Sequence, residues 1–487
     1  MGIPDVKQNQ RDMGRAESRK TLHKWLFLLT GIAGAFFFYF LLPAAWSDPA
    51  KAMISLLLLC VFYWICEPVP LGLTAILLLV LLLVFRVVSM DVLFSGFSSP
   101  AVFLIIAGMM LANGVKDTPL ISRMTYTFLA RWGDTAKGLL ASILVLPQLQ
   151  AFFIPAAAVR TALVLPAALL SLERIGAKKD SPLTKMVLLG VAFGGTISGT
   201  AVMTAAIGNM ITVELLNEYL ELNISYWQWF YYTFPVWVLM VPAAWFVLLK
   251  RFPLTRDEAV IPDLKEEGKR RLEELGSFSR REIKCLSILM LTVVLWFTEP
   301  LHGFHPSIPA LIAVILMGLP GTGCSTWEKM VKINFDTVIL MGVTLSLGFA
   351  FNRSGAAALI GESLNAGWLI NLLSSPVTAV LTVLILTHVL HLAVSNVSTA
   401  VITLIPIFIG LSEKAGADPV LICVTAAVAC LHGYILVVES TPNIVVHSTG
   451  RLEPREYIIP GLQMTVIMTV IMMLTALTWW KWVGLLS

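Results

Sequence analysis

Residues 384–409 read LILTHVLHLAVSNVSTAVITLIPIFI, which is two apolar runs joined by the polar cluster SNVST. A simple transmembrane helix rarely carries hydroxyl and amide side chains in such a run. At membrane depth, irregular backbone survives only where it is buried in protein or lines a cavity. The pattern therefore predicts a re-entrant hairpin over about 368–412, with Ser395, Asn396 and Thr399 at its tip.

The composition indicates that the chain lies in a membrane. It is 57% hydrophobic and 13% charged, whereas charged residues make up about 25% of an ordinary soluble protein. A water-soluble globule of 487 residues cannot hide so much apolar surface, because it needs a polar exterior. The net charge of +4 is too small to indicate a nucleic-acid partner. We therefore expect an all-α polytopic integral membrane protein surrounded by membrane lipid.

Lysine and arginine residues set the expected orientation, because cytoplasmic loops are rich in them. The basic arm at 1–24 and the polar linker at 250–284 should both be cytoplasmic, which places the N-terminus on that side. The apolar stretch from Trp25 to Pro43 could be a signal peptide, but its length and the spans that follow favour an uncleaved first helix. We expect the membrane to be the inner membrane of a bacterium.

The two halves of the sequence echo each other. The matches are Glu67-Pro68 with Glu299-Pro300 (299 − 67 = 232), Ala157 with Ser395 (395 − 157 = 238) and Asn209 with Asn443 (443 − 209 = 234). We expect the first helix and one repeat in 25–249, with a hairpin at about 138–172, and a second repeat in 285–487. The number of crossings makes the second copy inverted, a layout found in many secondary transporters.

The segment Ser440-Thr441-Pro442-Asn443 is a second polar interruption. Proline removes a backbone donor and breaks the helix, so the freed carbonyls need a bound cation or a facing hairpin. The N-terminus of a half-helix suits a carboxylate. Two structural readings remain open: a plain proline kink here, and helix–helix adhesion by the polar residues of the hairpin tip.

Several of these motifs together resemble the divalent anion/sodium symporter family. They are Glu67-Pro68-Val69-Pro70, the pair Ser395-Asn396, and Thr441-Pro442-Asn443 followed by Ile444-Val445-Val446. The similarity extends over about 50–485. It implies about eleven transmembrane helices, two re-entrant hairpins, a homodimer and elevator-type movement. It also implies carriage of dicarboxylates, citrate or sulfate.

The resemblance also implies a set of site residues, because in that family the hairpin tips hold substrate carboxylates and the neighbouring unwound helices complete Na⁺ sites. The expected substrate contacts are Arg160, Thr161, Ser395, Asn396, Thr399, Thr441 and Pro442. The expected cation contacts are Asn209, Ser395, Asn396, Ser440 and Asn443. No cofactor is expected, apart from Na⁺ as a coupling ion.

The first hairpin departs from the family pattern. Its tip reads Ala157-Ala158-Val159 with no Ser-Asn pair nearby, and Arg160 follows. A charged group at membrane depth is expensive and is a functional candidate. We hypothesise that Arg160 supplies fixed positive charge, replacing a bound cation or holding a substrate carboxylate. The alternatives are that it extends to the surface or pairs with a carboxylate for structure.

The expected function is secondary active transport of small divalent anions, most readily C4 dicarboxylates, by cation-coupled symport or anion exchange. A cation/proton antiporter is the alternative, but it would favour buried carboxylates in both halves, and only Glu439 offers one. Glu439 either exchanges a proton or serves a structural role, and His388 and His391 lack a third metal ligand. The chain has neither a zinc-protease motif nor a nucleophile elbow, so we do not expect an enzyme.

Overall fold

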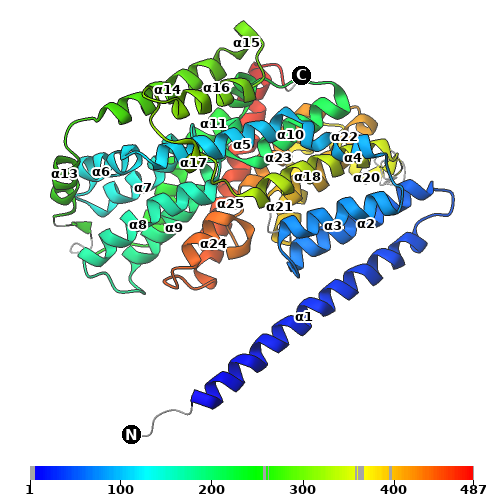
Figure 1. Ribbon diagram of the computed structural model, residues 1–487, viewed down its shortest axis with the longest axis horizontal. Coiled ribbons are helices and arrows are strands. Elements are labelled where there is room, and N and C mark those ends of the chain that lie inside the picture. The colour runs from blue at the N-terminus through cyan, green and yellow to red at the C-terminus, as the bar shows by residue number, and fades with distance from the viewer. Residues whose placement is uncertain are drawn as a thin grey trace.

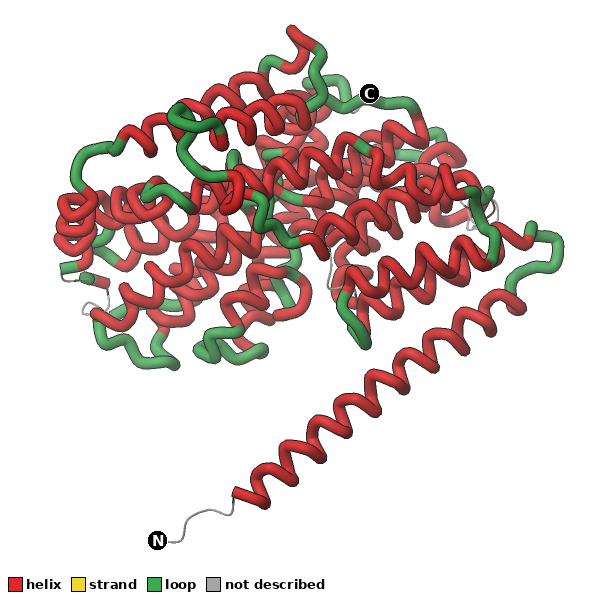
Figure 2. Tube along the Cα trace, in the orientation of Figure 1, coloured by secondary structure: helices red, strands yellow, loops and turns green. Residues whose placement is uncertain are grey.

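The computed structural model describes residues 6–255, 259–261, 263–356, 359, 367–393 and 397–485. In this part of the chain the regular structure is helical, and Figure 2 shows helices joined by loops without a strand. The all-α prediction is therefore confirmed. Ser395 and Asn396, the predicted centre of the second hairpin tip, lie outside the described residues.

The helices follow one another along the chain in two comparable series. The first series is α1 (Val6–Leu41), α2 (Asp48–Cys66), α3 (Leu71–Val84), α4 (Met90–Ser98), α5 (Pro100–Lys116), α6 (Leu120–Trp132), α7 (Ala136–Gln150), α8 (Ala157–Arg174), α9 (Pro182–Ile197), η1 (Met203–Ala205), α10 (Ile207–Leu220) and α11 (Tyr226–Arg251). The linker contains α13 (Leu264–Leu275). The second series is α14 (Arg280–Phe297), α15 (Glu299–His302), α16 (Ser307–Gly318), α17 (Trp327–Met330), α18 (Phe335–Arg353), α20 (Gly367–Leu373), α21 (Pro376–Ala393), α22 (Val397–Ala415), α23 (Pro419–Leu431), η2 (Val437–Glu439), α24 (Thr441–His447), α25 (Arg455–Thr475) and η3 (Ala476–Trp480).

Local sequence signals explain where several of these helices begin. Ser181 accepts a hydrogen bond from the Thr184 amide at the start of α9, and Pro182 occupies the first helical position. Ser225 and Gln228 form a reciprocal capping box at the start of α11. Asp418 caps α23 in the same way that Ser181 caps α9.

Seven described helices are long and apolar enough to span a membrane, or eight if the bent pair α20–α21 is one span. That pair is bent by 118° at its break. The described residues also include four shorter apolar helices, α3, α9, α16 and α23. The chain is thus polytopic, while the expected total of eleven spans remains a prediction.

The first helix differs from all the others in its environment. Figure 1 shows α1 running alone along one side of the molecule, away from the packed body. Only 6% of its apolar window is buried within the chain. It touches α2, where the Tyr63 hydroxyl donates to the Leu28 carbonyl at 2.6 Å. Lipid or another chain must therefore cover most of α1.

The body has a core in which the two series pack against each other. Helices α8 and α22 form the second halves of the two predicted hairpins and are called the hairpin arms below. They lie against α9 and α23 of their own series. In addition, α8 packs against α24 and α22 packs against α10. Each arm thus also contacts the helix that follows the 3₁₀ turn of the opposite series. This cross-packing places the starts of four helices around one region of the molecule.

Candidate functional site

Two helices are interrupted at corresponding places, and the interruptions share one conformation. The first break lies between α9 and α10 and the second between α23 and α24, and each contains a short 3₁₀ turn. The residue before the following helix is extended in both: Ala206 has φ −144° and ψ 138°, and Ser440 has φ −140° and ψ 143°. These residues are separated by the same 234 positions as the matched asparagines (440 − 206 = 234).

A buried asparagine closes each break in the same manner. The side-chain amide of Asn209 donates to the carbonyls of Gly199 at 2.8 Å and Val202 at 3.3 Å. The side-chain amide of Asn443 donates to the carbonyls of Gly433 at 3.3 Å and Leu436 at 3.0 Å. Each asparagine thereby satisfies two backbone acceptors that the interrupted helix leaves free.

Neither asparagine is fully satisfied. The Oδ1 atoms of Asn209 and Asn443 are buried without a hydrogen-bond partner in the described part of the chain. A buried acceptor without a partner is costly, so each oxygen is available to a cation or to a donor on a ligand.

Helices α8, α9 and α24 meet closely at the first break. Gly195 of α9 has no side chain, and a Cβ there would overlap Thr161 Oγ1 and lie 3.2 Å from the Pro442 Cβ. Next to it, the hydroxyls of Thr196 and Ser440 are 3.3 Å apart. Thr161 and Pro442, which are far apart in the sequence, are thus brought together beside one glycine.

Helices α10 and α22 meet in a similar way. A Cβ on Gly208 would lie 2.8 Å from Val397 Cγ1 and 3.3 Å from Val401 Cγ2. The second hairpin arm therefore begins directly against the helix that follows the first break. Thr399, two residues along that arm, is 1% exposed.

Arg160 is the charged residue at the centre of this region, and its side chain is fully buried. Its Nε donates to Ser198 Oγ at 2.8 Å, and its Nη1 donates to the carbonyl of Ala205 at 3.0 Å. Nη1 also donates to the carbonyl of Ile154 in the first hairpin tip. The guanidinium therefore occupies a nest of three oxygen atoms supplied by the hairpin tip and the first break.

The charge of Arg160 is not neutralised inside the protein. No carboxylate of the described residues lies within ion-pair distance of it, and its Nη2 has no hydrogen-bond partner there. An unpaired buried charge is unfavourable, so this environment favours a bound anion. The alternatives of extension to the surface and of a structural carboxylate pair do not match this geometry.

The helix starts around Arg160 add partial positive charge. α8 begins after Ala156 and α10 begins after Ala206, and neither alanine can cap the free amides with a side chain. α24 differs, because Ser440 Oγ accepts a hydrogen bond from the backbone N–H of Asn443 and so caps the helix. Its next residue, Thr441, is exposed.

The structure brings most predicted site residues into this region. Arg160, Thr161, Asn209, Ser440, Pro442 and Asn443 surround the two breaks, Thr399 lies on the adjoining arm, and Thr441 is at its surface. The geometry adds Thr196, Ser198 and His432, which the sequence reasoning did not single out. The 234-residue spacing pairs Ser198 with His432 (432 − 198 = 234), and it was the signal by which both could have been found.

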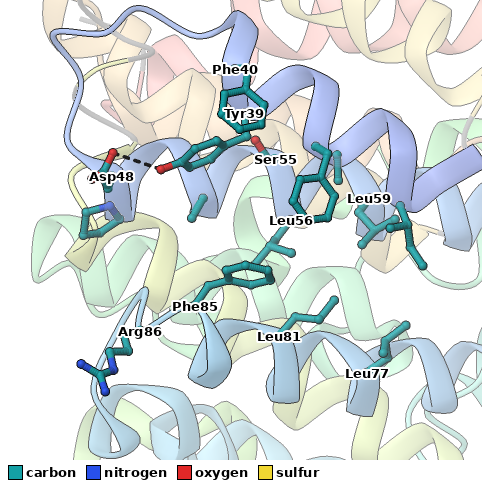
Figure 3. Close-up of a pocket in the computed structure, with 15 residues that line it drawn as sticks. Tyr39, Phe40, Asp48, Ser55, Leu56, Leu59, Leu77, Leu81, Phe85 and Arg86 are labelled. Atoms are coloured by element: carbon teal, nitrogen blue, oxygen red, sulfur yellow. Dashed lines mark hydrogen bonds between the residues drawn. The ribbon is translucent and has the colours of Figure 1, made fainter.

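An apolar cavity lies elsewhere and does not suit an anion. It occupies about 550 Å³ between α1, α2 and α3, and Figure 3 shows apolar side chains such as Leu56, Leu81 and Phe85 around it. At one end the Tyr39 hydroxyl donates to Asp48 at 3.0 Å. Arg86 also lines this cavity, but it is exposed, so a divalent anion within the apolar part would be desolvated with little compensation.

A second cavity of about 630 Å³ is lined by carboxylates rather than cations. Glu214 and Glu299 face it together with His305, whose Nε2 is 3.8 Å from Glu214. Negative charge of this kind repels an anion, so we do not assign the anion site to this cavity either.

Comparisons with known proteins agree with a membrane transporter. A family model described as the sodium:sulfate symporter transmembrane region matches residues 21–486. A sodium-dependent dicarboxylate transporter, SdcS of Staphylococcus saprophyticus, is 24% identical over 458 residues, covering 89% of this chain and 86% of the relative. SdcS of Staphylococcus aureus is 24% identical over 437 residues, covering 85% and 82%.

Two other similarities are weaker or less informative. A membrane protein of Cupriavidus necator is 25% identical over 398 residues, covering 80% of this chain and 76% of the relative. The YdaH transporter of Alcanivorax borkumensis matches in structure with a TM-score of 0.48 and 15% identity, covering 81% of this chain and 88% of that one.

Proposed function

Since the chain belongs to the sodium:sulfate symporter family, we propose that it transports small divalent anions, most readily C4 dicarboxylates, by secondary active transport. The dicarboxylate preference is supported by its SdcS relatives, which are sodium-dependent dicarboxylate transporters. The observation that carries the proposal is the buried, unneutralised guanidinium of Arg160 at the meeting point of two broken helices.

In this proposal Arg160 stands in for one bound cation. Carbonyl and hydroxyl oxygens are the ligands that Na⁺ requires, and here the carbonyls of Ile154 and Ala205 and the hydroxyl of Ser198 already accept hydrogen bonds from the guanidinium. Fixed charge at the first break leaves the second break as the place for a mobile cation. Asn443, Ser440 and the tip residues Ser395 and Asn396 are the proposed cation contacts there.

The matching breaks support two inverted repeats with an elevator-type movement. The repeated element order, the recurring asparagine bridges and the cross-packed arms are what such a design needs. The substrate would contact Thr161, Thr399, Thr441 and Pro442, together with Ser395 and Asn396. We propose a homodimer in a bacterial inner membrane with a cytoplasmic N-terminus.

The cation/proton antiporter alternative has less support. An antiporter on this plan would favour a buried carboxylate at both breaks, but Ala205 stands 234 residues before Glu439 (439 − 205 = 234). The first break therefore carries a fixed cation where an antiporter would carry an exchangeable acid.

Counterflow in proteoliposomes tests the proposal. Liposomes loaded with unlabelled succinate should accumulate radiolabelled succinate from outside, with malate, citrate and sulfate as competitors. Succinate and malate should compete best. Flux of Na⁺ or H⁺ without any flux of these anions would overturn the proposal.

A further inference from the structure

A second cluster of titratable side chains lies where α21 packs against α23 and η2. His391 and Glu439 are each 3% exposed, and His432 is 1% exposed. His388 lies one helical turn before His391 on α21 and is half-buried. The proposed anion contacts include none of His388, His391 and Glu439, whereas His432 borders the first break through Thr200.

Gly433 allows two of these side chains to approach each other. A Cβ placed there would lie 2.7 Å from the Glu439 Cβ and 2.8 Å from the His391 Cε1. Both side chains therefore occupy the space beside one residue of the second break. Any residue larger than glycine at this position would force them apart.

The polar atoms of the pair are incompletely used. One Glu439 oxygen, Oε2, accepts a hydrogen bond from the Ile435 amide at 2.8 Å, whereas Oε1 is buried without a partner in the described part of the chain. Neither ring nitrogen of His391 completes a hydrogen bond within the described residues. The carboxylate and the imidazole do not hydrogen-bond to each other in this conformation, so a proton that they share would pass between them through one bridging water.

The neighbouring groups do not neutralise this pair. His432 is engaged on both nitrogens, with the Val428 carbonyl at 2.7 Å and Thr200 Oγ1 at 3.3 Å. The remaining titratable side chains nearby are neutral thiols and phenols: Cys430 and Tyr434 beside the break, and Tyr457 on α25, whose hydroxyl donates to the Asn443 carbonyl at 3.3 Å. No lysine or arginine of the described residues forms an ion pair with Glu439.

The geometry points to a proton-binding site shared by His391 and Glu439, which couples anion transport to H⁺. This inference rests on the proposed transport of anions. The proton enters from water and forms one O–H or N–H bond on the pair. No other bond changes.

The physical link to the anion is charge. Glu439 lies two residues before Thr441, which is the first residue of α24 and a proposed substrate contact. As a carboxylate it repels a dianion and offsets the positive charge of Arg160. Protonation of the pair removes that repulsion and leaves Arg160 to bind the anion, so the anion and the proton bind together.

The donor set favours a proton over a metal ion. Within the described residues, no three His, Cys, Asp or Glu side chains converge in a way that could hold a metal. The two ring nitrogens of His391 on α21 and the free oxygen of Glu439 on η2 can accept a proton, but they are too few to complete a metal site.

The test measures succinate uptake and proton uptake together in proteoliposomes that contain a trapped pH-sensitive dye. Na⁺ is kept equal on both sides, and the membrane potential is clamped with potassium and valinomycin. An inward gradient of about one pH unit should speed wild-type uptake by up to about tenfold, the ratio of proton concentrations, and should acidify the lumen only when succinate is present.

Three variants make the result specific. Glu439→Gln mimics the protonated acid, so it should keep counterflow of succinate but lose both the gradient response and the dye signal. His391→Gln should shift or flatten the pH dependence. Glu214→Gln removes a partly buried carboxylate outside the cluster and should respond like wild type.

The outcomes separate this inference from the proposed function. Wild-type succinate uptake with no gradient response overturns the proton site and leaves anion transport intact. A full gradient response in Glu439→Gln overturns it as well. Absence of counterflow in every preparation would instead contradict the proposed function itself.

Discussion

At the scale of single residues, the account depends on one buried charge. A charged side chain at the centre of a bilayer costs about 2.5–3.5 kcal/mol even by the lower scales, so it is retained only for a purpose. Arg160 uses two of its nitrogens on oxygens of the protein and has no carboxylate partner among the described residues. Its charge is therefore available to an anion.

Replacing Arg160 with Gln should reduce succinate uptake by about 100-fold or more, because an unbalanced buried charge is worth roughly 3–5 kcal/mol. Arg160→Lys keeps the charge and should retain more activity. Initial rates in proteoliposomes measure both effects. The control is Arg86→Gln, which removes an exposed arginine at the end of α3.

Uptake that is equal in wild type, Arg160→Gln and Arg160→Lys would remove this residue from the transport cycle. Protein yield and elution profile in detergent must match among the variants, so that a loss of rate is not a loss of folding.

The sequence indicated Arg160 as a functional candidate because an isolated charge in an apolar run is visible without a structure. It could not predict that Ser198 and Ala205 surround the guanidinium. Those contacts depend on how closely the first hairpin tip approaches the break between α9 and α10, and spacing along the chain does not encode that distance.

At the scale of elements, the two breaks work only if their helices approach closely. Gly195 permits the approach of α9 to α8 and α24, since a Cβ there would overlap Thr161 and lie 3.2 Å from Pro442. Overpacking a tight contact usually costs about 1–3 kcal/mol.

Gly195→Ala should therefore lower succinate uptake by about tenfold, because a displacement of α24 costing roughly 1.4 kcal/mol changes an equilibrium tenfold. Gly34→Ala is the matched control, since its Cβ would meet no heavy atom within 4 Å. Equal rates in the two variants would show that the contact at Gly195 has no functional role.

The linker helix α13 is fastened by a buried carboxylate outside the membrane. Glu267 accepts hydrogen bonds from Arg270 at 2.8 Å and Arg271 at 2.9 Å, and Arg174 of α8 lies 3.2 Å away. The hydrogen bond from Arg270, followed by that from Arg271, holds the pKa of Glu267 below its usual 4.5.

A carboxylate with a lowered pKa stabilises the folded state above its ordinary pKa of 4.5, and that stability is lost as the pH falls through the lowered value. We expect the melting temperature in detergent to fall more steeply in wild type than in Glu267→Gln on acidification below about pH 4.5. Near neutral pH the variant should melt lower. Parallel curves over the whole range would contradict this role for Glu267.

The breaks themselves were partly predictable from the sequence. Pro442 and the polar residues around it predicted the second break. The match of Asn209 with Asn443 at a spacing of 234 residues suggested the first. The packing of α22 against α10 and α8 against α24 was not predictable, because long-range pairing of apolar helices leaves no periodic signal. The conformation at Ser395 and Asn396 remains a prediction, since both lie outside the described residues.

At the scale of the whole molecule, the arms and broken helices form one packed group. α7–α10 and α21–α24 contact one another, while α18 borders this group through α10 and α22. The Tyr219 hydroxyl of α10 donates to the Gly348 carbonyl of α18 at 2.9 Å. An elevator-type movement would slide the packed group past α18 and break this contact.

A cross-link across that border should stop transport. Leu215 of α10 lies against Gly348 of α18, where a Cβ would be 2.6 Å from the Leu215 Cδ2. In a variant lacking the six native cysteines, Leu215→Cys with Gly348→Cys should lose succinate uptake on treatment with Hg²⁺ and regain it with dithiothreitol.

The control pair lies within the packed group. Leu140→Cys with Gly190→Cys joins α7 to α9, whose contact should persist through the movement, so its cross-link should leave uptake largely unchanged. Inhibition by the control pair but not by the first pair would contradict the proposed division of the molecule.

The Na⁺ dependence of the initial rate of succinate uptake, at fixed pH and clamped membrane potential, tests most directly whether Arg160 replaces a bound cation. With the guanidinium in place of one ion, the rate should depend on Na⁺ hyperbolically, with a Hill coefficient of about 1, or not at all. A sigmoidal dependence with a coefficient of about 2 in the wild-type protein would contradict this account, because it would require a mobile cation at both breaks.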